Sequence, residues 1–300
     1  RMKTPSLPPE ARRRTFRRQL LAWYDAYGRD LPWRVTDDPY HILVSEVMLQ
    51  QTQVDRVLPK YHEWLGKYPS FEALAAADER DVVRTWYPLG YNIRPRRLQS
   101  IARESVEKYG GTLPGDEATL LSFKGIGPYT AGAVMSFAFR KRAAILDTNV
   151  ARVLFRVFIG KGDHRGHTMD TRLWALSRAM LPVKHVFDFN QALMDFGATL
   201  CSARAPACPR LVELPARRRP GHAAHGDVRP EPAAGIAGLR AVLCDAESEP
   251  RPRCAARAAP PQLSPPSLHT GRCCGPAALA RSERSQSHAL LRRVLVPWIS

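Results

Sequence analysis

Residues 120–132 read LLSFKGIGPYTAG, which places two glycines between two apolar helical segments. Gly125 can adopt the left-handed backbone that closes a helix, and Pro128 suits the first turn of the next one. Gly127 lets a ligand approach the backbone closely. The stretch predicts a helix–hairpin–helix whose amides form an anion site suited to a DNA phosphate, with Lys124, Gly125 and Gly127 as DNA contacts. The alternative is an ordinary turn between two helices.

A glutamate interrupts the apolar helical segment at residues 42–49. Burying a carboxylate is costly unless it is paired or protonated, so Glu46 is a candidate functional residue with a raised pKa. The chain then turns polar at residues 50–53, which read QQTQ. A buried acid beside a run of amides indicates a pocket for a flat, polar ligand such as a nucleobase.

Apolar residues recur at helical spacing from residue 10 to residue 200, and no segment alternates as a strand does. Helices are predicted over residues 14–27, from Pro39 onward, and over 54–66, 71–77, 79–86, 93–108, 116–123, 129–139, 149–159, 168–181 and 187–199. The sequence therefore predicts an all-α fold.

Charge and composition indicate the class of partner. The chain has 300 residues and a net charge of +17, which favours nucleic acid over an anionic membrane, because no basic amphipathic helix is evident. A basic but otherwise ordinary soluble protein is the alternative. The sequence predicts no membrane-spanning helix and no signal peptide. All six cysteines lie at or after position 201, which favours a reducing, intracellular (cytoplasmic, nucleoid-associated) location.

The composition changes near residue 210. Beyond it the chain has no Lys, Phe, Tyr or Asn, and 14 of the 26 prolines lie in the last hundred residues. The sequence predicts a disordered N-terminus over residues 1–9, a helical region over 10–210, and an Arg/Pro/Ala-rich tail over 211–300. The tail is either a disordered DNA-tethering segment or an out-of-frame translation, and composition favours the second interpretation.

Asp147 follows a short apolar segment and precedes a predicted helix. Aspartate is a favoured N-cap, and most aspartates in this setting only cap the helix. Asp147, however, comes twenty residues after Gly127, in a chain that also buries Glu46. These two acids are therefore candidates for one shared site.

Taken together, these segments resemble the adenine DNA glycosylases of the helix–hairpin–helix base-excision superfamily. The similarity is carried by residues 31–34 (LPWR), 45–54 (SEVMLQQTQV), 89–91 (LGY), 125–133 (GIGPYTAGA), 147–152 (DTNVAR) and 189–191 (FNQ), and it extends over about residues 10–210. The resemblance implies a monomeric, two-lobed helical catalytic region with a DNA cleft between the lobes. It implies excision of adenine mispaired with guanine or 8-oxoguanine from double-stranded DNA.

Two other functions stay open at this point. One is a thymine or uracil mismatch glycosylase of the same superfamily. The other is a catalytically impaired DNA-binding relic.

The resemblance also implies roles for single residues. Glu46 protonates adenine, and Asp147 stabilises the sugar cation or bonds to it transiently. The apolar setting of Glu46 raises its pKa, whereas a helix start keeps Asp147 ionised. The remaining roles are Tyr129 and Asn149 around the two acids, Leu31, Trp33, Arg34 and Gln191 near the extruded adenine, and Gln51, Thr52 and Tyr91 at the DNA base stack. Trp33 and Tyr91 have an alternative role as core aromatics, and Arg34 as a surface charge.

Position 129 predicts the subtype. Related enzymes that also cut the DNA strand carry a lysine there, which forms a Schiff base with the sugar. Tyr129 cannot form one, so the chain is predicted to be monofunctional.

Most members of this family hold a [4Fe–4S] cluster with four cysteines spaced Cys-x6-Cys-x2-Cys-x5-Cys. Here Cys201 and Cys208 have the first spacing, the third position is Leu211, and the next cysteine, Cys244, is too distant. With two of four ligands, the cluster expected from the family is predicted to be absent or unstable, and residues 201–210 are a truncated cluster segment. A frame error or a small deletion at residues 209–210 accounts for both the lost ligands and the tail.

Overall fold

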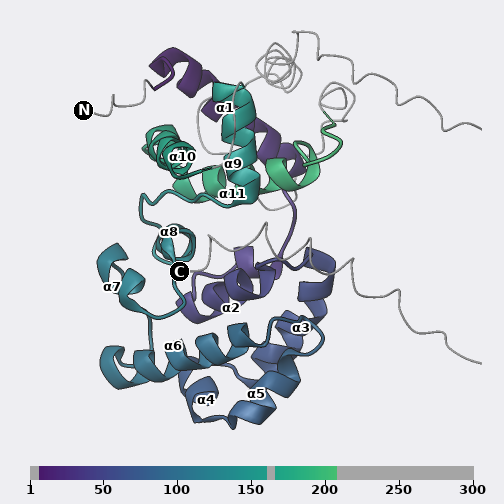
Figure 1. Ribbon diagram of the computed structural model, residues 1–300, viewed down its shortest axis with the longest axis vertical. Helices are drawn as coiled ribbons and strands as arrows, with labels where there is room; N and C mark the ends of the chain where they lie inside the picture. Colours follow the sequence, from purple (N-terminus) through teal and green to yellow (C-terminus); the bar gives the residue numbers. More distant parts are fainter. Residues whose placement is uncertain (1–6, 161–165, 208–300) are drawn as a thin grey trace, which may run out of the picture. The chain divides into compact units, whose positions relative to one another are not determined.

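The computed structural model describes residues 7–160 and 166–207 (Figure 1). These residues belong to the first of two compact units, Arg1–Ser248. The predicted tail over 211–300, Cys208 and most of the predicted N-terminal segment lie outside the described residues.

The described part of the chain is helical and contains no strand. Its elements are α1 (Glu10–Tyr27), the 3-10 turn η1 (Pro32–Arg34), α2 (Pro39–Leu49), α3 (Val54–Lys67), α4 (Phe71–Ala76), α5 (Glu79–Trp86), α6 (Ile93–Tyr109), α7 (Glu117–Ser122), α8 (Pro128–Phe137), α9 (Thr148–Leu154), the π-helical turn η2 (Phe155–Ile159), α10 (His167–Met180) and α11 (Val186–Thr199). The predicted all-α fold is confirmed.

Two predicted boundaries differ from the structure by more than two residues. Helix α1 begins at Glu10, four residues before the predicted start, directly after Pro9. The predicted helix over 149–159 is α-helical only to Leu154 and continues as the π-helical turn η2.

Aspartates set the start of several helices. The side chains of Asp38, Asp78, Asp116 and Asp147 each accept a backbone N–H from the first turn of the helix that follows. Such a cap satisfies donors that have no partner within the helix. Asp147 is thus a cap, as its sequence position alone suggested, and its position is fixed by the helix it starts.

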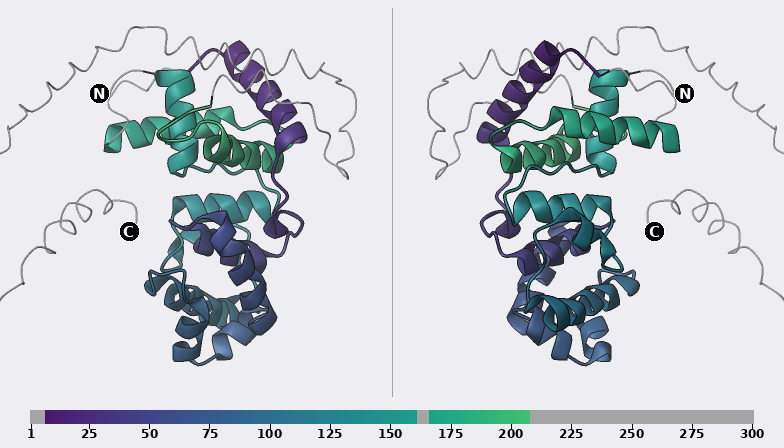
Figure 2. Two further views of the ribbon diagram at one scale, coloured as in Figure 1. Left: turned by 90° about the vertical axis from the view of Figure 1, so that its right-hand side faces the viewer. Right: turned by 90° about the vertical axis from the view of Figure 1, so that its left-hand side faces the viewer.

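The helices form two groups with α8 between them (Figures 1 and 2). In one group α11 packs against α1 and α9, and in the other α6 packs against α4 and α5. Helix α8 contacts both α2 and α11. The arrangement agrees with the predicted two lobes and makes α8, which follows the hairpin, the element they share.

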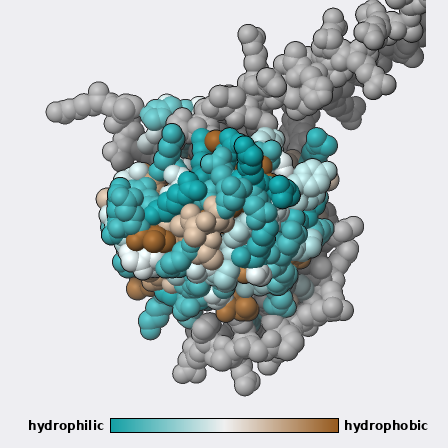
Figure 3. All heavy atoms as spheres, turned by 90° about the horizontal axis from the view of Figure 1, so that it is seen from below, coloured by the Kyte–Doolittle hydropathy of each residue, from teal (hydrophilic) through white to brown (hydrophobic). Residues whose placement is uncertain are grey.

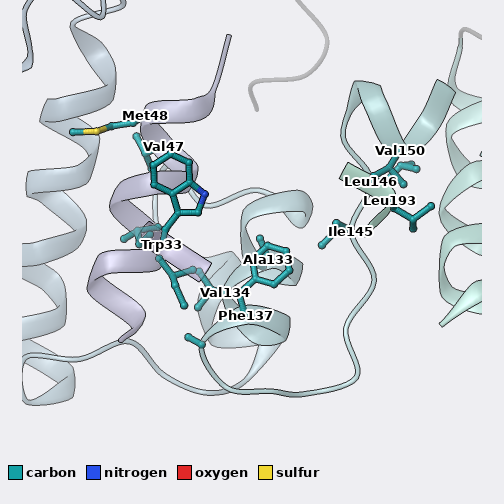
Figure 4. Packing of buried hydrophobic residues seen from close by; sticks show 14 of the residues in the cluster. Trp33, Val47, Met48, Ala133, Val134, Phe137, Ile145, Leu146, Val150 and Leu193 are labelled. Carbon is teal, nitrogen blue, oxygen red and sulfur yellow. The ribbon is translucent and has the colours of Figure 1, made fainter. Parts of the chain in front are cut away.

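Apolar side chains fill the space around α8. Figure 4 shows Phe137 and its neighbours on α8 between Val47 of α2 on one side and Ile145 and Leu193 on the other. A polar link lies in the same layer, where Asn190 of α11 donates to Ser136 Oγ at 2.9 Å. Packing and this buried hydrogen bond hold α8 in register with both groups.

Two glycines allow backbone segments near the site to approach closely. A Cβ atom on Gly132 of α8 would lie 2.1 Å from the carbonyl oxygen of Ala144. A Cβ atom on Gly197 of α11 would lie 2.8 Å from Cβ of Asn149. Any side chain at these positions would push away the segment that carries Asp147.

The face seen in Figure 3 is mostly hydrophilic, with small and separate apolar patches. Such a surface is typical of a face in contact with water. Among the described helices, none combines the length and the apolar character needed to cross a membrane.

Candidate active site

Glu46 lies in the last turns of α2, where nearly every side chain is buried. Only 3% of its surface is exposed. Tyr129, from the first turn of α8, donates its hydroxyl to Glu46 Oε2 at 2.7 Å. The hairpin thus positions the tyrosine that holds the buried acid.

Burial raises the pKa of Glu46 to about 7. The hydrogen bond from Tyr129 and the positive charge of Arg34 oppose this rise, whereas the negative charge of Asp147 adds to it. The predicted direction of the shift is confirmed. A carboxyl group with this pKa is substantially protonated near neutral pH, as a general acid must be.

Asp147 presents both carboxylate oxygens to donors. Oδ1 accepts the Val150 N–H at 2.6 Å, and Oδ2 accepts the Asn149 amide at 3.0 Å. Arg152 in turn donates to Asn149 Oδ1 at 2.7 Å, which orients the amide. Asn149 therefore lies beside the acid, as predicted, and helps to hold it.

The net pKa shift of Asp147 is upward. Removal from water raises its pKa, while the hydrogen bonds from Val150 and Asn149 and the charge of Arg152 lower it. The prediction considered only the helix start, which favours the ionised form, and burial outweighs that effect. Asp147 nevertheless accepts hydrogen bonds from two donors, Val150 and Asn149, whereas Glu46 accepts one from Tyr129. Because such bonds stabilise the ionised form, Asp147 is the acid better suited to carry the negative charge.

The two acids share one site with Tyr129. Burial raises the pKa of Tyr129, and the charges of Glu46 and Asp147 raise it further. The charge of Asp147 also raises the pKa of Glu46. The three groups come from α2, α8 and the start of α9. The structure therefore brings together the acids that the sequence proposed as a pair.

Arg34 is buried, so its alternative as a surface charge is wrong. Its guanidinium forms a bidentate pair with Asp195 of α11 at 2.7 and 2.8 Å, and Arg29 also pairs with Asp195. Burial alone would raise the pKa of Asp195, but these two arginines lower it below its usual value. The positive charge of Arg34 also lowers the pKa of Glu46.

The other residues expected near the base are buried. Leu31, Trp33 and Gln191 are each less than a tenth exposed. The Trp33 ring packs edge-on against Tyr61 with centroids 5.3 Å apart. Trp33 is therefore a core aromatic in this structure, and its contact with a base stays a prediction.

The hairpin has the predicted form with one shifted boundary. Helix α7 ends at Ser122, one residue before the predicted end at 123, and Gly125 has a positive φ of 109°. Lys124 and Gly125 are exposed, and Pro128 begins α8 as predicted. Gly127 is the N-cap of that helix, and no side chain caps the amides of its first turn.

Two further predicted DNA contacts lie in exposed turns. Tyr91 is 60% exposed, so its alternative as a core aromatic is wrong, and Gln51 is exposed as well. Both residues have positive φ, 51° and 56°. Thr52 is partly buried, and its hydroxyl accepts hydrogen bonds from Arg94. Sequence reasoning did not identify Arg94.

Of the four thiolates that a [4Fe–4S] cluster needs, the described residues contain one, Cys201. Cys201 is buried, and its sulfur accepts a hydrogen bond from Arg156 at 3.4 Å. Arg156 also donates to the carbonyls of Ser202 and Ala203, so protein groups hold this segment. Within residues 7–160 and 166–207, no three His, Cys, Asp or Glu side chains gather as metal ligands. That the chain lacks a stable cluster stays a prediction.

Comparison with known proteins shows which family the chain resembles. Residues 44–178 match the family described as HhH-GPD superfamily base excision DNA repair protein. The chain is 43% identical to the Homo sapiens adenine DNA glycosylase over 202 residues, which are 64% of this chain and 37% of that protein. It is 34% identical to the Methanothermobacter thermautotrophicus thymine/uracil-DNA glycosylase over 200 residues, 66% of this chain and 90% of that protein.

A solved structure supports the same assignment. The structure of a thermostable thymine-DNA glycosylase has a TM-score of 0.62 and 33% identity, covering 67% of this chain and 93% of that one. The chain spans less than two fifths of the human relative's length. From the match along almost all of the shorter relatives, the chain belongs to the HhH-GPD superfamily of base excision DNA repair proteins.

Proposed function

We propose that the chain is a DNA glycosylase that hydrolyses the N-glycosidic bond of adenine mispaired with guanine or 8-oxoguanine in double-stranded DNA, acting as a monomer. The observation that carries the proposal is the buried Glu46, whose pKa of about 7 lies at working pH, in one site with Asp147. The similarity to the human adenine DNA glycosylase supports adenine as the base.

Glu46 is the proposed general acid. In its protonated form it transfers a proton to a ring nitrogen of the extruded adenine, which makes the base a better leaving group. Tyr129 donates its hydroxyl to Oε2 of Glu46, and this hydrogen bond fixes the orientation of the carboxyl group. The N-glycosidic bond then breaks, and neutral adenine leaves with the transferred proton.

Asp147 is the proposed stabiliser of the developing positive charge on the sugar. An ionised carboxylate at this point either balances the cation or bonds to C1′ until water displaces it. Water adds to C1′ and its proton passes to the Glu46 carboxylate, which restores the acid and completes the hydrolysis. Because Tyr129 carries no amine, no Schiff base forms, and the enzyme leaves the strand intact.

The exposed turns are the proposed DNA contacts. The hairpin amides at Lys124, Gly125 and Gly127 are the proposed site for a phosphate of the DNA backbone. Gln51 and Tyr91, from two separate turns, are proposed to enter the base stack where the adenine has left it. Tyrosine offers a flat face for stacking, and glutamine offers hydrogen bonds to the partner base.

An alkali-cleavage assay tests this function. Duplexes with A opposite G and A opposite 8-oxoguanine should yield abasic sites that alkali cuts, without cutting before alkali. Duplexes with T or U opposite G test the second candidate, a thymine or uracil glycosylase, which the Methanothermobacter thermautotrophicus relative favours. Cutting confined to the T or U duplexes would replace adenine as the substrate. Binding of all duplexes without cutting would leave a DNA-binding relic.

The pH dependence of base release should follow Glu46. The single-turnover rate should fall as pH rises through about 7, because the acid loses its proton there. The Tyr129 hydrogen bond lowers the pKa of Glu46, so Tyr129→Phe should move this midpoint to higher pH. Rates measured across pH 5–9 on saturated enzyme (a range of about two units on each side) give the midpoint. If the midpoint is the same in Tyr129→Phe as in the parent, the fall in rate at high pH is not caused by deprotonation of Glu46.

A further inference from the structure

Arg94 is a buried cation without a carboxylate partner in the described part of the chain. It is 5% exposed and lies in the first turn of α6. Burial lowers its pKa. A buried charge is costly unless other groups compensate it, so the groups around Arg94 must stabilise its positive charge.

The compensating groups are carbonyl oxygens of two separate turns. One guanidinium nitrogen donates to Val47 and Met48 at 3.1 Å each and also to Gln50. The other donates to Leu89 at 3.0 Å and Gly90 at 3.1 Å.

Arg94 also contacts a hydroxyl group and two aromatic rings. Both guanidinium nitrogens reach Thr52 Oγ1 at 3.3 Å. The guanidinium carbon also lies over the rings of Trp86 and Tyr91, 5.1 and 5.4 Å from their centroids. One side chain therefore ties the end of α2 to the turn before α6.

Each of these turns contains one exposed non-glycine residue in a left-handed conformation. Gln51 has φ of 56° and Tyr91 has φ of 51°, and neither is a glycine. Such conformations cost energy and persist only where the surroundings impose them. Arg94 bonds to the carbonyls directly before each residue, at Gln50 and Gly90. It is thus in the right place to impose both conformations at once.

We infer that Arg94 is a positioning residue that holds the turns of Gln51 and Tyr91 as one rigid unit for entry into the DNA stack. This inference rests on the proposed function. Arginine is needed because its planar fork reaches both turns, whereas a lysine has the charge but a single nitrogen. Arg94 touches no reacting atom and acts only through the two turns.

The test uses Arg94→Lys on the full chain, with Gln99→Leu as the matched control. Gln99 lies on the same helix, is buried, and donates to the carbonyls of Leu74 at 3.1 Å and Ala77 at 2.7 Å. Both variants remove buried hydrogen bonds from α6, so thermal unfolding should show a loss of stability in each. Only Arg94→Lys should change how DNA is engaged.

The first readout needs no catalysis. A duplex with A opposite G carries 2-aminopurine beside the G, and its fluorescence rises when neighbouring bases unstack. Arg94→Lys should reduce the rise on binding about tenfold, a coupling expected within one hydrogen-bond network. Gln99→Leu should keep the rise. A parent protein with no rise, or an Arg94→Lys variant with the full rise, would overturn the inference.

The second readout is a double-mutant cycle on base release. Arg94→Lys should slow single-turnover release about tenfold in the parent but less than about twofold when Tyr91→Ala is already present. The midpoint near pH 7 should not move, since Arg94 is not among the groups that shift Glu46. Equal losses in both backgrounds, or a moved midpoint, would contradict the inference. If the parent releases no adenine, the proposed function fails and the fluorescence result alone decides the role of Arg94.

Discussion

Glu46→Gln is expected to reduce adenine release by about a thousandfold, within the range for removal of a general acid. Glutamine keeps the shape of the side chain and can still accept the Tyr129 hydrogen bond, but it has no proton to transfer. Single-turnover release from the A:G duplex measures the effect. DNA affinity should stay near that of the parent, because Glu46 is buried. Residual release within a few-fold of the parent would remove Glu46 from the acid role.

The same variant should be more stable than the parent in alkaline solution. The pKa of Glu46 is about 7 in the folded protein against 4.5 for a free glutamate. The parent therefore loses stability as pH rises from 4.5 to 7, because the folded state holds a proton that the unfolded state has released. Glutamine removes this loss, which is worth about 3 kcal/mol above pH 7. Urea unfolding at pH 8 and pH 4 should show a gain only at pH 8.

Asp195→Asn is expected to lower the free energy of unfolding by about 3–5 kcal/mol, because it leaves the buried charge of Arg34 without its partner. Asp195 is 0% exposed and accepts from Arg34 and Arg29 at 2.7–2.8 Å. Chemical denaturation at neutral pH measures the loss. Because the pKa of Asp195 is lowered, its contribution is present above the usual carboxyl range and disappears as pH falls through the lowered value. The difference from the parent should shrink in acid.

The matched control for Asp195 is Glu10→Gln. Glu10 also pairs with two arginines, Arg13 and Arg17, but at the protein surface. Its removal should change the free energy of unfolding little, since water already screens the pair. Equal effects of the two substitutions would show that burial does not strengthen the Asp195 cluster.

Glu46 and Asp195 show how far the sequence predicts the site. Glu46 was identifiable because it interrupts an apolar helix, and Asp195 carries the same signal between Met194 and Phe196. The second signal was overlooked because the matching motif ends at Gln191. The same logic applied to α11 would have predicted that Asp195 has a buried cationic partner, although not that the partner is Arg34.

Arg94 could not be predicted in the same way. Its partners are backbone carbonyls of separate turns, and every residue has a backbone carbonyl, so the residue types do not indicate which of them bind Arg94. The helices themselves were predictable, because periodicity and aspartate caps are local signals. The π-helical turn over Phe155–Ile159 was not, since its residues fit the same apolar periodicity as an α-helix.

Asp147 serves both as the cap of α9 and as the proposed catalytic carboxylate, so a substitution at this position affects both roles. Asparagine is also a good cap, so a change from aspartate to asparagine could keep the bond from the Val150 N–H while removing the charge and the bond from Asn149. If the chain excises adenine as proposed, the resulting protein would bind its mispair without releasing the base.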